Sequence, residues 1–203
     1  MKIYFKHEKS FIKEDKILCE AYCIPENETD EDLLNKGWLP SMEEKNVWYQ
    51  SRSCRLNVDN LKQSKRRINT INKLDTNFFK YEKNIKIDNF FKQYYLRKQF
   101  NIFNFYENCS DFFDVSVVEV SYKEDVVAYA RFTERANSNI FLDLSYTEKF
   151  SKFSLGTNLY FILANYTKKQ NKKYLYIFES YKNLYEYKEN FTNVEIWDGL
   201  KWV

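Results

Sequence analysis

The segment "KFSLGTNLYFILANYTKKQNKKYLYIF" (residues 152–178) decides the fold that we expect. After Gly156, one of only three glycines in the chain, apolar residues recur at the spacing of an amphipathic helix. They are Leu159, Ile162, Leu163 and Tyr166. The polar stretch "KKQNKK" then ends the helix, and the apolar run "YLYIF" predicts a buried strand. An extended segment therefore gives way to a helix at Gly156, and the helix leads into a strand.

Three strand-like segments precede this helix. They are "VSVVEV" (115–120), "VVAYARF" (126–132) and "NIFLDLSY" (139–146), and short turns separate them. After the buried strand we expect a short helix in "SYKNLYEYKENF" (180–191) and a last strand in "NVEIWDGLKWV" (193–203). Three antiparallel strands, a helix, a parallel strand, a helix and a final strand form an order similar to that of the GNAT fold. We therefore expect an α/β (α+β) protein with a GNAT-like, mostly antiparallel splayed sheet and flanking helices.

The first half of the chain is less regular. We expect extended segments at 2–6 and 17–24, and a short helix in "DEDLLNKG" that Asp30 caps and Gly37 ends. "VWYQSRSCRLNV" (47–58) alternates like one half-buried strand with its arginines facing solvent. The division that we predict is a smaller N-terminal subdomain over 1–84 and a GNAT-like core over 85–203.

Two helical patterns lie around this boundary. In "DNLKQSKRRINTINKLD" (59–75), the densest basic segment, helical spacing places Lys62, Lys65 and Arg66 on one face. That face is either simply solvated or a binding surface. "KIDNFFKQYYLRKQF" (86–100) carries an aromatic stripe, and such stripes usually pack in a core.

Composition excludes several classes of protein. The formal net charge of +3 is too small to indicate a nucleic-acid partner by itself, and no apolar run approaches the roughly 18 residues of a membrane-spanning helix. The amino terminus has no apolar core of a signal peptide, so we expect a cytoplasmic protein with neither a membrane nor DNA as partner. Its four cysteines are then more consistent with reduced thiols than with disulfides.

The helix start at Ser154 to Thr157 has several interpretations. Successive backbone amides must approach a pyrophosphate closely, so a turn with the single glycine Gly156 is a poor cradle for coenzyme A. It suits a smaller phosphate or a ribose, because helix-start amides and two hydroxyls are present. An interpretation without any ligand is a helix that Ser154 caps, with Gly156 allowing close packing against a strand.

The carboxyl-terminal half combines "SLGT" at a helix start, a Tyr-Lys pair followed by Phe, and a terminal Asp-Gly-x-Trp. These residues are Ser154, Leu155, Gly156, Thr157, Tyr187, Lys188, Phe191, Asp198, Gly199 and Trp202. With these motifs the chain resembles the arginyl- and leucyl-tRNA-protein transferases. Earlier segments match more loosely: "CEAYCIPENETDEDLLNKGW", "SRSCRLNV" and "SKRRI". The family's middle cysteine cluster is reduced here to Cys54, and the segment before "SLGT" lacks its usual proline.

This resemblance implies transfer of an amino acid, with arginine or leucine as the first candidates, from charged tRNA to the α-amino group of a protein or peptide. Aminoacyl-tRNA would be a co-substrate, and we expect no cofactor. Asp143 would orient the amine or accept its proton, or else be an ordinary strand-end carboxylate. Tyr146 lies at the family's aromatic position, or packs in the core.

Two further groups of residues receive roles from the resemblance. Ser154, Leu155, Gly156, Thr157, Tyr187 and Lys188 would hold the aminoacyl 3′ end. Arginine forks match phosphate and carboxylate alike, so the tRNA backbone or an acidic acceptor would be bound by Arg52, Arg55, Lys65, Arg66 and Arg67.

Three alternatives stay open at the level of sequence. The strand order also fits an acetyl-CoA-dependent N-acetyltransferase. A non-catalytic module that binds RNA or peptide could share the fold. Cys19 and Cys23, with Cys54, have part of the spacing of a metal site, but a second close pair is missing, so we expect no metal.

Overall fold

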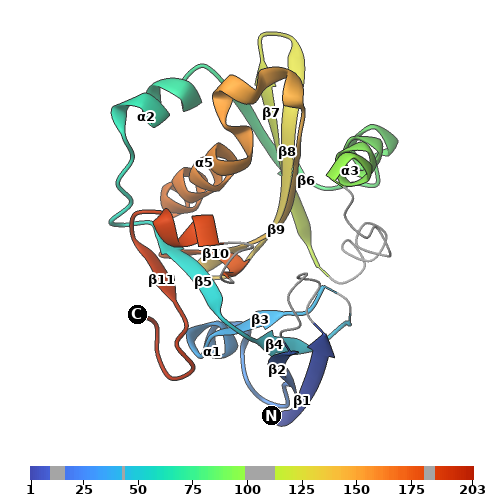
Figure 1. Cartoon of the computed structure of the whole chain (residues 1–203), viewed down its shortest axis with the longest axis vertical. Helices are drawn as coiled ribbons and strands as arrows, with labels where there is room; N and C mark the ends of the chain where they lie inside the picture. The colour runs from blue at the N-terminus through green and yellow to red at the C-terminus, as the bar shows by residue number, and fades with distance from the viewer. Residues whose placement is uncertain (10–16, 43, 99–112, 181–185) are drawn as a thin grey trace.

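The computed structural model describes residues 1–9, 17–42, 44–98, 113–180 and 186–203 (Figure 1). In chain order its elements are β1 (Lys2–Lys9), β2 (Ile17–Ile24), α1 (Asp30–Asn35), β3 (Trp38–Pro40), β4 (Trp48–Gln50), β5 (Ser53–Asn57), α2 (Lys65–Ile71), β6 (Asp75–Lys80), α3 (Ile85–Lys98), β7 (Val115–Tyr122), β8 (Asp125–Glu134), β9 (Ser138–Tyr146), η1 (Glu148–Phe153), α5 (Leu155–Lys169), β10 (Tyr174–Glu179), η2 (Glu186–Asn190) and β11 (Val194–Ile196). No helix in these described ranges has the length and apolar character to cross a membrane.

The described strands form two sheets. The larger has seven strands in the order β11-β5-β10-β9-β8-β7-β6, and the smaller has the order β1-β2-β4-β3. Strands β6 to β9 form an antiparallel meander, and β10 then pairs parallel to β9. The three predicted strands, the helix and the parallel strand are therefore confirmed. A turn at Lys123 connects β7 to β8, and a turn near Asn137 connects β8 to β9. The register of these pairs follows from the apolar pattern, because side chains alternate between the two faces of a strand.

Strands β9 and β10 separate soon after they begin. Their paired residues are Tyr174 with Ser138, Leu175 with Asn139, and Tyr176 with Ile140. Beyond this point the aromatic ring of Phe141 on β9 meets Tyr160 of α5 at 4.7 Å and Phe178 of β10 at 6.5 Å between ring centroids. Phe178 has a φ of 62°, so the backbone of β10 turns away there. Bulky side chains thus fill the place where ladder hydrogen bonds would otherwise continue, and the sheet splays as predicted.

Two helices cover opposite faces of the large sheet (Figure 1). Helix α5 packs on one face through a core that includes Leu159, Leu163 and Val118. Helix α3 covers part of the other face, where Ile87 and Phe91 pack with Val117 and Tyr129. The aromatic stripe of α3 is thus core, as its pattern indicates.

The segment 47–58 is not one strand. It forms β4 in the small sheet and β5 in the large sheet, with a bend at Ser51 and Arg52 between them. β5 lies between β10 and β11, antiparallel to both. The large sheet also includes β6, so it takes strands from both sides of residue 84. The division into 1–84 and 85–203 remains a prediction.

Several local expectations need correction. Thr29 caps α1, because its side chain accepts from the Asp32 amide, and Asp30 is the first helical residue. Helix α2 begins at Lys65 after the cap Ser64, so Lys62 does not share its face. Strand β6 was not predicted, since "DTNFFK" has only a short apolar run. The last strand is short, and part of the expected helix at 180–191 (residues 181–185) lies outside the described residues.

Candidate active site at the splayed strands

Helix α5 starts at the mouth between β9 and β10. Ser154 occupies the N-cap position in the left-handed region (φ 47°, ψ 46°), and its side chain makes no capping hydrogen bond. Its carbonyl accepts from the amides of Thr157 at 3.1 Å and Asn158 at 3.0 Å. The Leu155 and Gly156 amides have no acceptor in the described part of the chain. A cap by the Ser154 side chain is therefore wrong, and two donors remain at the helix start.

A pocket of about 230 Å³ opens beside this helix start. Its lining consists of Tyr146, Thr147, Ser151, Ser154, Leu155, Gly156 and Thr157. The structure thus brings together Tyr146 and the four residues Ser154 to Thr157 that the sequence singled out. The lining includes several hydroxyl groups and the helix-start amides, and such groups hydrogen-bond to phosphate, ribose or a developing oxyanion.

Gly156 is explained by the approach of Tyr146. A Cβ atom at this position would lie 3.0 Å from Cε1 of the Tyr146 ring. The glycine therefore allows the end of β9 to pack closely on the first turn of α5, as the interpretation without a ligand expects. The same contact forms one wall of the pocket, so close packing and ligand binding are compatible.

Further tyrosines surround Tyr146. The rings of Tyr94 on α3 and Tyr146 lie 5.0 Å apart, and burial, with help from the Tyr146 hydroxyl, raises the pKa of Tyr94 well above its usual range. The hydroxyls of Tyr160 and Tyr187 are 3.3 Å apart, and burial raises the pKa of Tyr187. Sequence reasoning missed Tyr94 and Tyr160, because aromatic residues at helical spacing cannot be divided into core and site without knowing what each faces.

Asp143 makes a buried ion pair with Arg131. The Nε of Arg131 donates to Oδ1 at 2.8 Å, a second guanidinium nitrogen donates to Oδ2, and the Tyr95 hydroxyl donates to Oδ2 at 3.1 Å. The side chains of Arg131 and Asp143 are 1% and 5% exposed, and the guanidinium stacks 4.3 Å from the Phe91 ring centre. Asp143 is not part of the pocket lining, and its proposed role with the amine stays a prediction.

Lys188 hydrogen-bonds to the backbone at the end of β10. Its ammonium is buried and donates to the carbonyls of Ile177 at 2.7 Å and Glu179 at 2.9 Å, where a bulge interrupts the pairing of β10 with β5. Burial lowers the pKa of Lys188. It therefore satisfies carbonyls that the bulge leaves without ladder partners, and it does not line the pocket. Tyr187, its neighbour, is partly exposed and faces Tyr160.

The two arginines of the segment 51–55 differ. Arg52 is about half exposed and pairs with Glu189 at 3.1 Å. Arg55 is buried, pairs with Glu195 at 2.7 Å and stacks 3.7 Å from the centre of the Tyr174 ring. The expectation that both arginines face solvent is wrong for Arg55, because a carboxylate and aromatic faces replace water around it.

Helix α2 is attached to the start of α5 through Arg67. The Nε of Arg67 donates to Oδ1 of Asn158 at 3.2 Å, and its guanidinium lies 3.8 Å from the centre of the Phe161 ring. Lys65 and Arg66 on the same helix are exposed. The basic face predicted on this helix therefore keeps these two residues, close in the fold to the start of α5, while Arg67 has a packing role.

Other cations flank the pocket and were missed from sequence. Arg97 at the end of α3 donates to the Tyr146 carbonyl, and Lys98 pairs with Glu148 at 3.2 Å. Lys152 lies two residues before Ser154, with its ammonium 5.2 Å from the Phe153 ring centre. They come from two separate segments, α3 and η1, so no single charge run in the sequence could reveal them together.

The cysteines of the described core are isolated thiols. Cys23 lies in the core beneath the small sheet and Cys54 in the core of the large one. Burial raises the pKa of Cys23 to about 11 and that of Cys54 to about 12. No three His, Cys, Asp or Glu side chains gather as metal ligands within the described ranges, and the Cys19 side chain lies outside them. Buried neutral thiols are poor metal ligands.

Three solved structures are similar to this chain. FemX matches with a TM-score of 0.52 and 9% identity over 75% of this chain and 60% of its own. The C-terminal domain of a putative lysylphosphatidylglycerol synthetase from Agrobacterium fabrum matches with a TM-score of 0.50 and 9% identity over 69% and 52%. L-PGS from Bacillus licheniformis gives 0.48 and 12% over 66% and 46%.

The extent of these matches limits what they show. This chain spans 46% to 60% of the three solved chains, about half of their length. No protein-family model matches the chain, and no curated protein matches it. At these identities the likeness concerns the fold alone. Together with the splayed strands and the helix between them, it shows a GNAT-like fold with mixed sheets and flanking helices.

Proposed function

We propose that the protein is an aminoacyltransferase that moves an amino acid from charged tRNA to the α-amino group of a peptide or protein. The observation that supports this most is the pocket at the start of α5, which combines two free helix-start amides, several hydroxyls and Tyr146 with a single glycine. Such a site suits one phosphate or ribose and a reacting carbonyl rather than a long pyrophosphate-containing cofactor.

The surroundings of the pocket suit the end of a nucleic acid. Aromatic rings bind unstacked bases, and the partly exposed rings of Tyr146 and Tyr187 lie near the mouth, with the buried Tyr94 packed behind Tyr146. Lys65, Arg66 and Lys152 lie on segments that border the start of α5 and would contact backbone phosphates. A basic rim around an aromatic pocket is the arrangement expected for a single-stranded 3′ end.

The reaction needs few protein groups. The amine nitrogen attacks the carbonyl carbon of the aminoacyl ester, the ribose oxygen leaves with its electron pair, and the amine proton passes to solvent or to a side chain. An α-amine with a pKa of about 7.7–8.0 is already partly neutral near neutral pH. The amides of Leu155 and Gly156 would stabilise the oxyanion, and the Tyr146 hydroxyl would hydrogen-bond to a reacting oxygen.

The neighbours support this donor class only by their names. One is a putative synthetase of lysylphosphatidylglycerol, a lipid that carries an amino acid, and its match concerns the fold. The choice of arginine or leucine as the transferred residue rests on the resemblance of "SLGT" and of the segment from Tyr187 to Trp202. Arginine would need an acidic pocket and leucine an apolar one.

An acetyl-CoA-dependent N-acetyltransferase is the second candidate, because the fold is GNAT-like. A pyrophosphate would need several successive amides, whereas the described residues at the helix start offer those of Leu155 and Gly156. Calorimetry with coenzyme A separates the two candidates, and we expect no binding at millimolar concentration. Tight binding would replace our proposal with this one.

The decisive experiment is a screen of charged tRNAs. Purified protein would be incubated with tRNA charged with one radiolabelled amino acid at a time and with a peptide pool that has free amino termini. We expect label to enter the peptides for a small set of donors, and to fall at least tenfold in the Tyr146→Phe variant if the hydroxyl takes part. Lys152→Ala should weaken tRNA binding without abolishing transfer. Absence of transfer from every charged tRNA would refute the proposal.

A further inference from the structure

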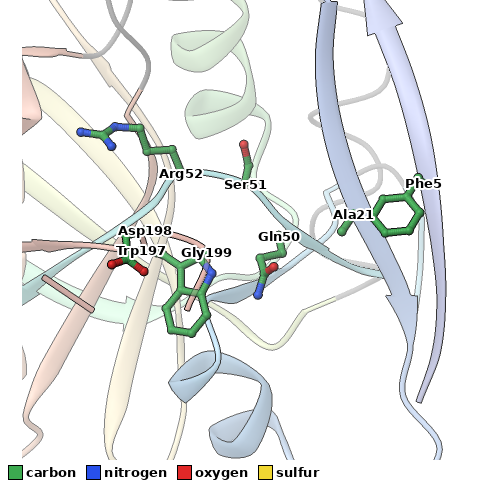
Figure 2. A pocket seen from close by; sticks show the side chains of 8 residues that line it. All are labelled: Phe5, Ala21, Gln50, Ser51, Arg52, Trp197, Asp198 and Gly199. Carbon is green, nitrogen blue, oxygen red and sulfur yellow. The ribbon is translucent and has the colours of Figure 1, made fainter. Parts of the chain in front are cut away.

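A second and larger pocket lies between the two sheets. It has a volume of about 360 Å³, and Phe5, Ala21 and Gln50 form one wall. These residues are cross-strand neighbours on β1, β2 and β4, since Phe5 pairs with Ala21 and Ala21 with Gln50. Figure 2 shows them facing Trp197 and Gly199, which follow β11. The pocket is therefore a wedge between the face of the small sheet and the C-terminal turn, a common place for ligands.

The lining mixes apolar surface with unused polar groups. Phe5 is 67% exposed, a large aromatic surface on the edge strand β1. The indole N–H of Trp197 has no acceptor among the described residues, although the side chain is only 8% exposed. Figure 2 shows this nitrogen on the ring edge that faces Gln50. Because an unsatisfied buried donor is costly, a backbone carbonyl in the wedge would be stabilising.

The wedge and the splayed mouth are connected through η2. Glu189 binds Arg52 at the edge of the wedge, and Lys188 holds the end of β10. Tyr187 contacts Tyr160 on the side of the mouth. Three consecutive residues thus run from the edge of the wedge toward the mouth. The two pockets open at the same end of the sheet, since Ser180 after β10 bonds to the Arg52 carbonyl and Tyr146 ends the parallel strand β9.

We propose that the wedge binds the acceptor peptide and receives an apolar side chain a few residues after its amino terminus. This inference rests on the proposed function, which places the reacting ester at the start of α5. Residues Tyr187 to Glu189 run between the wedge and the mouth, so the two sites are separated by a few residues of extended chain. An extended peptide advances about 3.3 Å per residue, so a side chain a few residues after the amine would reach the wedge, and we take the fourth position for the test.

The chemistry of the wedge defines the preferred side chain. Phe5, Ala21 and Trp197 provide apolar contact. Arg52 is paired with Glu189 through Nε and one terminal nitrogen, and the carboxylate of Asp198 also lines the wedge and would repel an acidic side chain. A phenylalanine or leucine at the fourth position would therefore be preferred over an aspartate. Burying such a side chain gains roughly 1.5–3 kcal/mol in general, which converts to at least about tenfold in affinity.

The test uses hexapeptide pools with free amino termini that differ only in having Phe or Asp at position four. With the donor found in the tRNA screen, we expect kcat/KM to be about tenfold higher for the Phe pool. Ala21→Leu fills the wedge and should remove this preference while leaving transfer to a single amino-acid amide unchanged. Phe5→Ala, at an exposed position, should also reduce the preference, and Ile3→Ala, 48% exposed on the same strand and outside the lining, is the matched control.

Direct binding separates this inference from the proposed function. Fluorescence anisotropy with C-terminally labelled pools measures peptide affinity without tRNA, and the same tenfold preference is expected there. If no tRNA supports transfer but the preference and its loss in Ala21→Leu are seen, the wedge is a peptide site and the donor is wrong. Equal binding of both pools, or a preference that persists in both Ala21→Leu and Phe5→Ala, would overturn the inference.

Discussion

The buried pair of Arg131 and Asp143 gives the sharpest prediction about stability. Replacing Asp143 by Asn keeps the size of the side chain but leaves the guanidinium of Arg131 without its counter-charge. Both side chains are almost fully buried, and the Nε to Oδ1 distance is 2.8 Å. Water cannot take over the role of the carboxylate, so we expect the free energy of unfolding to fall by about 3–5 kcal/mol. That is a large part of the roughly 5–15 kcal/mol of a typical domain.

A double variant separates two contributions to stability: the cost of leaving one buried charge unpaired, and the net contribution of the intact ion pair. Arg131→Met with Asp143→Leu removes both charges and keeps apolar volume beside Phe91. Apolar replacement of a buried pair is often close to neutral, so we expect the double variant to recover more than half of the lost stability. Neither substitution removes a residue of the pocket at α5.

Urea unfolding followed by circular dichroism measures the effect. With a slope of about 2 kcal/mol/M, Asp143→Asn should lower the midpoint by about 1.5–2.5 M. A shift below about 0.5 M, or a double variant as unstable as the single one, would refute this reasoning. Transfer activity of the folded double variant then tests the role of Asp143: activity that returns with stability assigns a structural role, and activity that stays absent assigns a chemical one.

Three further predictions concern single positions. Gly37 has a φ of 76°, and a Cβ there would lie 2.3 Å from the Trp197 ring, so Gly37→Ala should lower the melting temperature by several degrees at a cost of about 2–4 kcal/mol; an unchanged temperature would contradict the packing. Burial lowers the pKa of Lys188 below its usual 10.5, so the unfolded chain binds more protons than the folded one just below that pH. The stability of the wild type relative to Lys188→Met should therefore rise as pH increases toward 10.5, and a falling difference in alkaline unfolding curves would reverse this sign. The pKa of Cys54 is about 12, so peptide mapping should find it unmodified by iodoacetamide at about pH 8 in the native protein and modified in urea.

Much of the large sheet could be predicted from the sequence. The alternating segments that became β7, β8 and β9, and the helical spacing of α5, are local patterns, since each residue's face follows from its place along one element. The lysine-rich turn and the apolar run of β10 likewise indicate a crossover to a parallel strand. Because "SLGT" stands at that crossover, the sequence also located the pocket at the start of α5.

Other features depend on contacts between distant segments. The sequence around Cys54 could not show that β5 enters the large sheet between β10 and β11, because pairing partners lie more than 100 residues away. The burial of Arg55 depends in the same way on Glu195 and Tyr176, at sequence separations of 140 and 121 residues. Alternation alone predicted a solvent-facing arginine there.

The sequence by itself determined the order of elements, the helix start with its single glycine, and the short side chains that line it. Only the tertiary structure decided which charges are free and which are occupied. Lys188 and Arg67 are residue types that often bind anionic ligands. In the fold, Lys188 donates to backbone carbonyls of β10 and Arg67 attaches α2 to α5. The wedge between the sheets exists only because β1, β2 and β4 face the C-terminal turn. The burial of a side chain and its hydrogen-bond or ion-pair partners depend on contacts between two segments, whereas a sequence pattern describes one segment at a time.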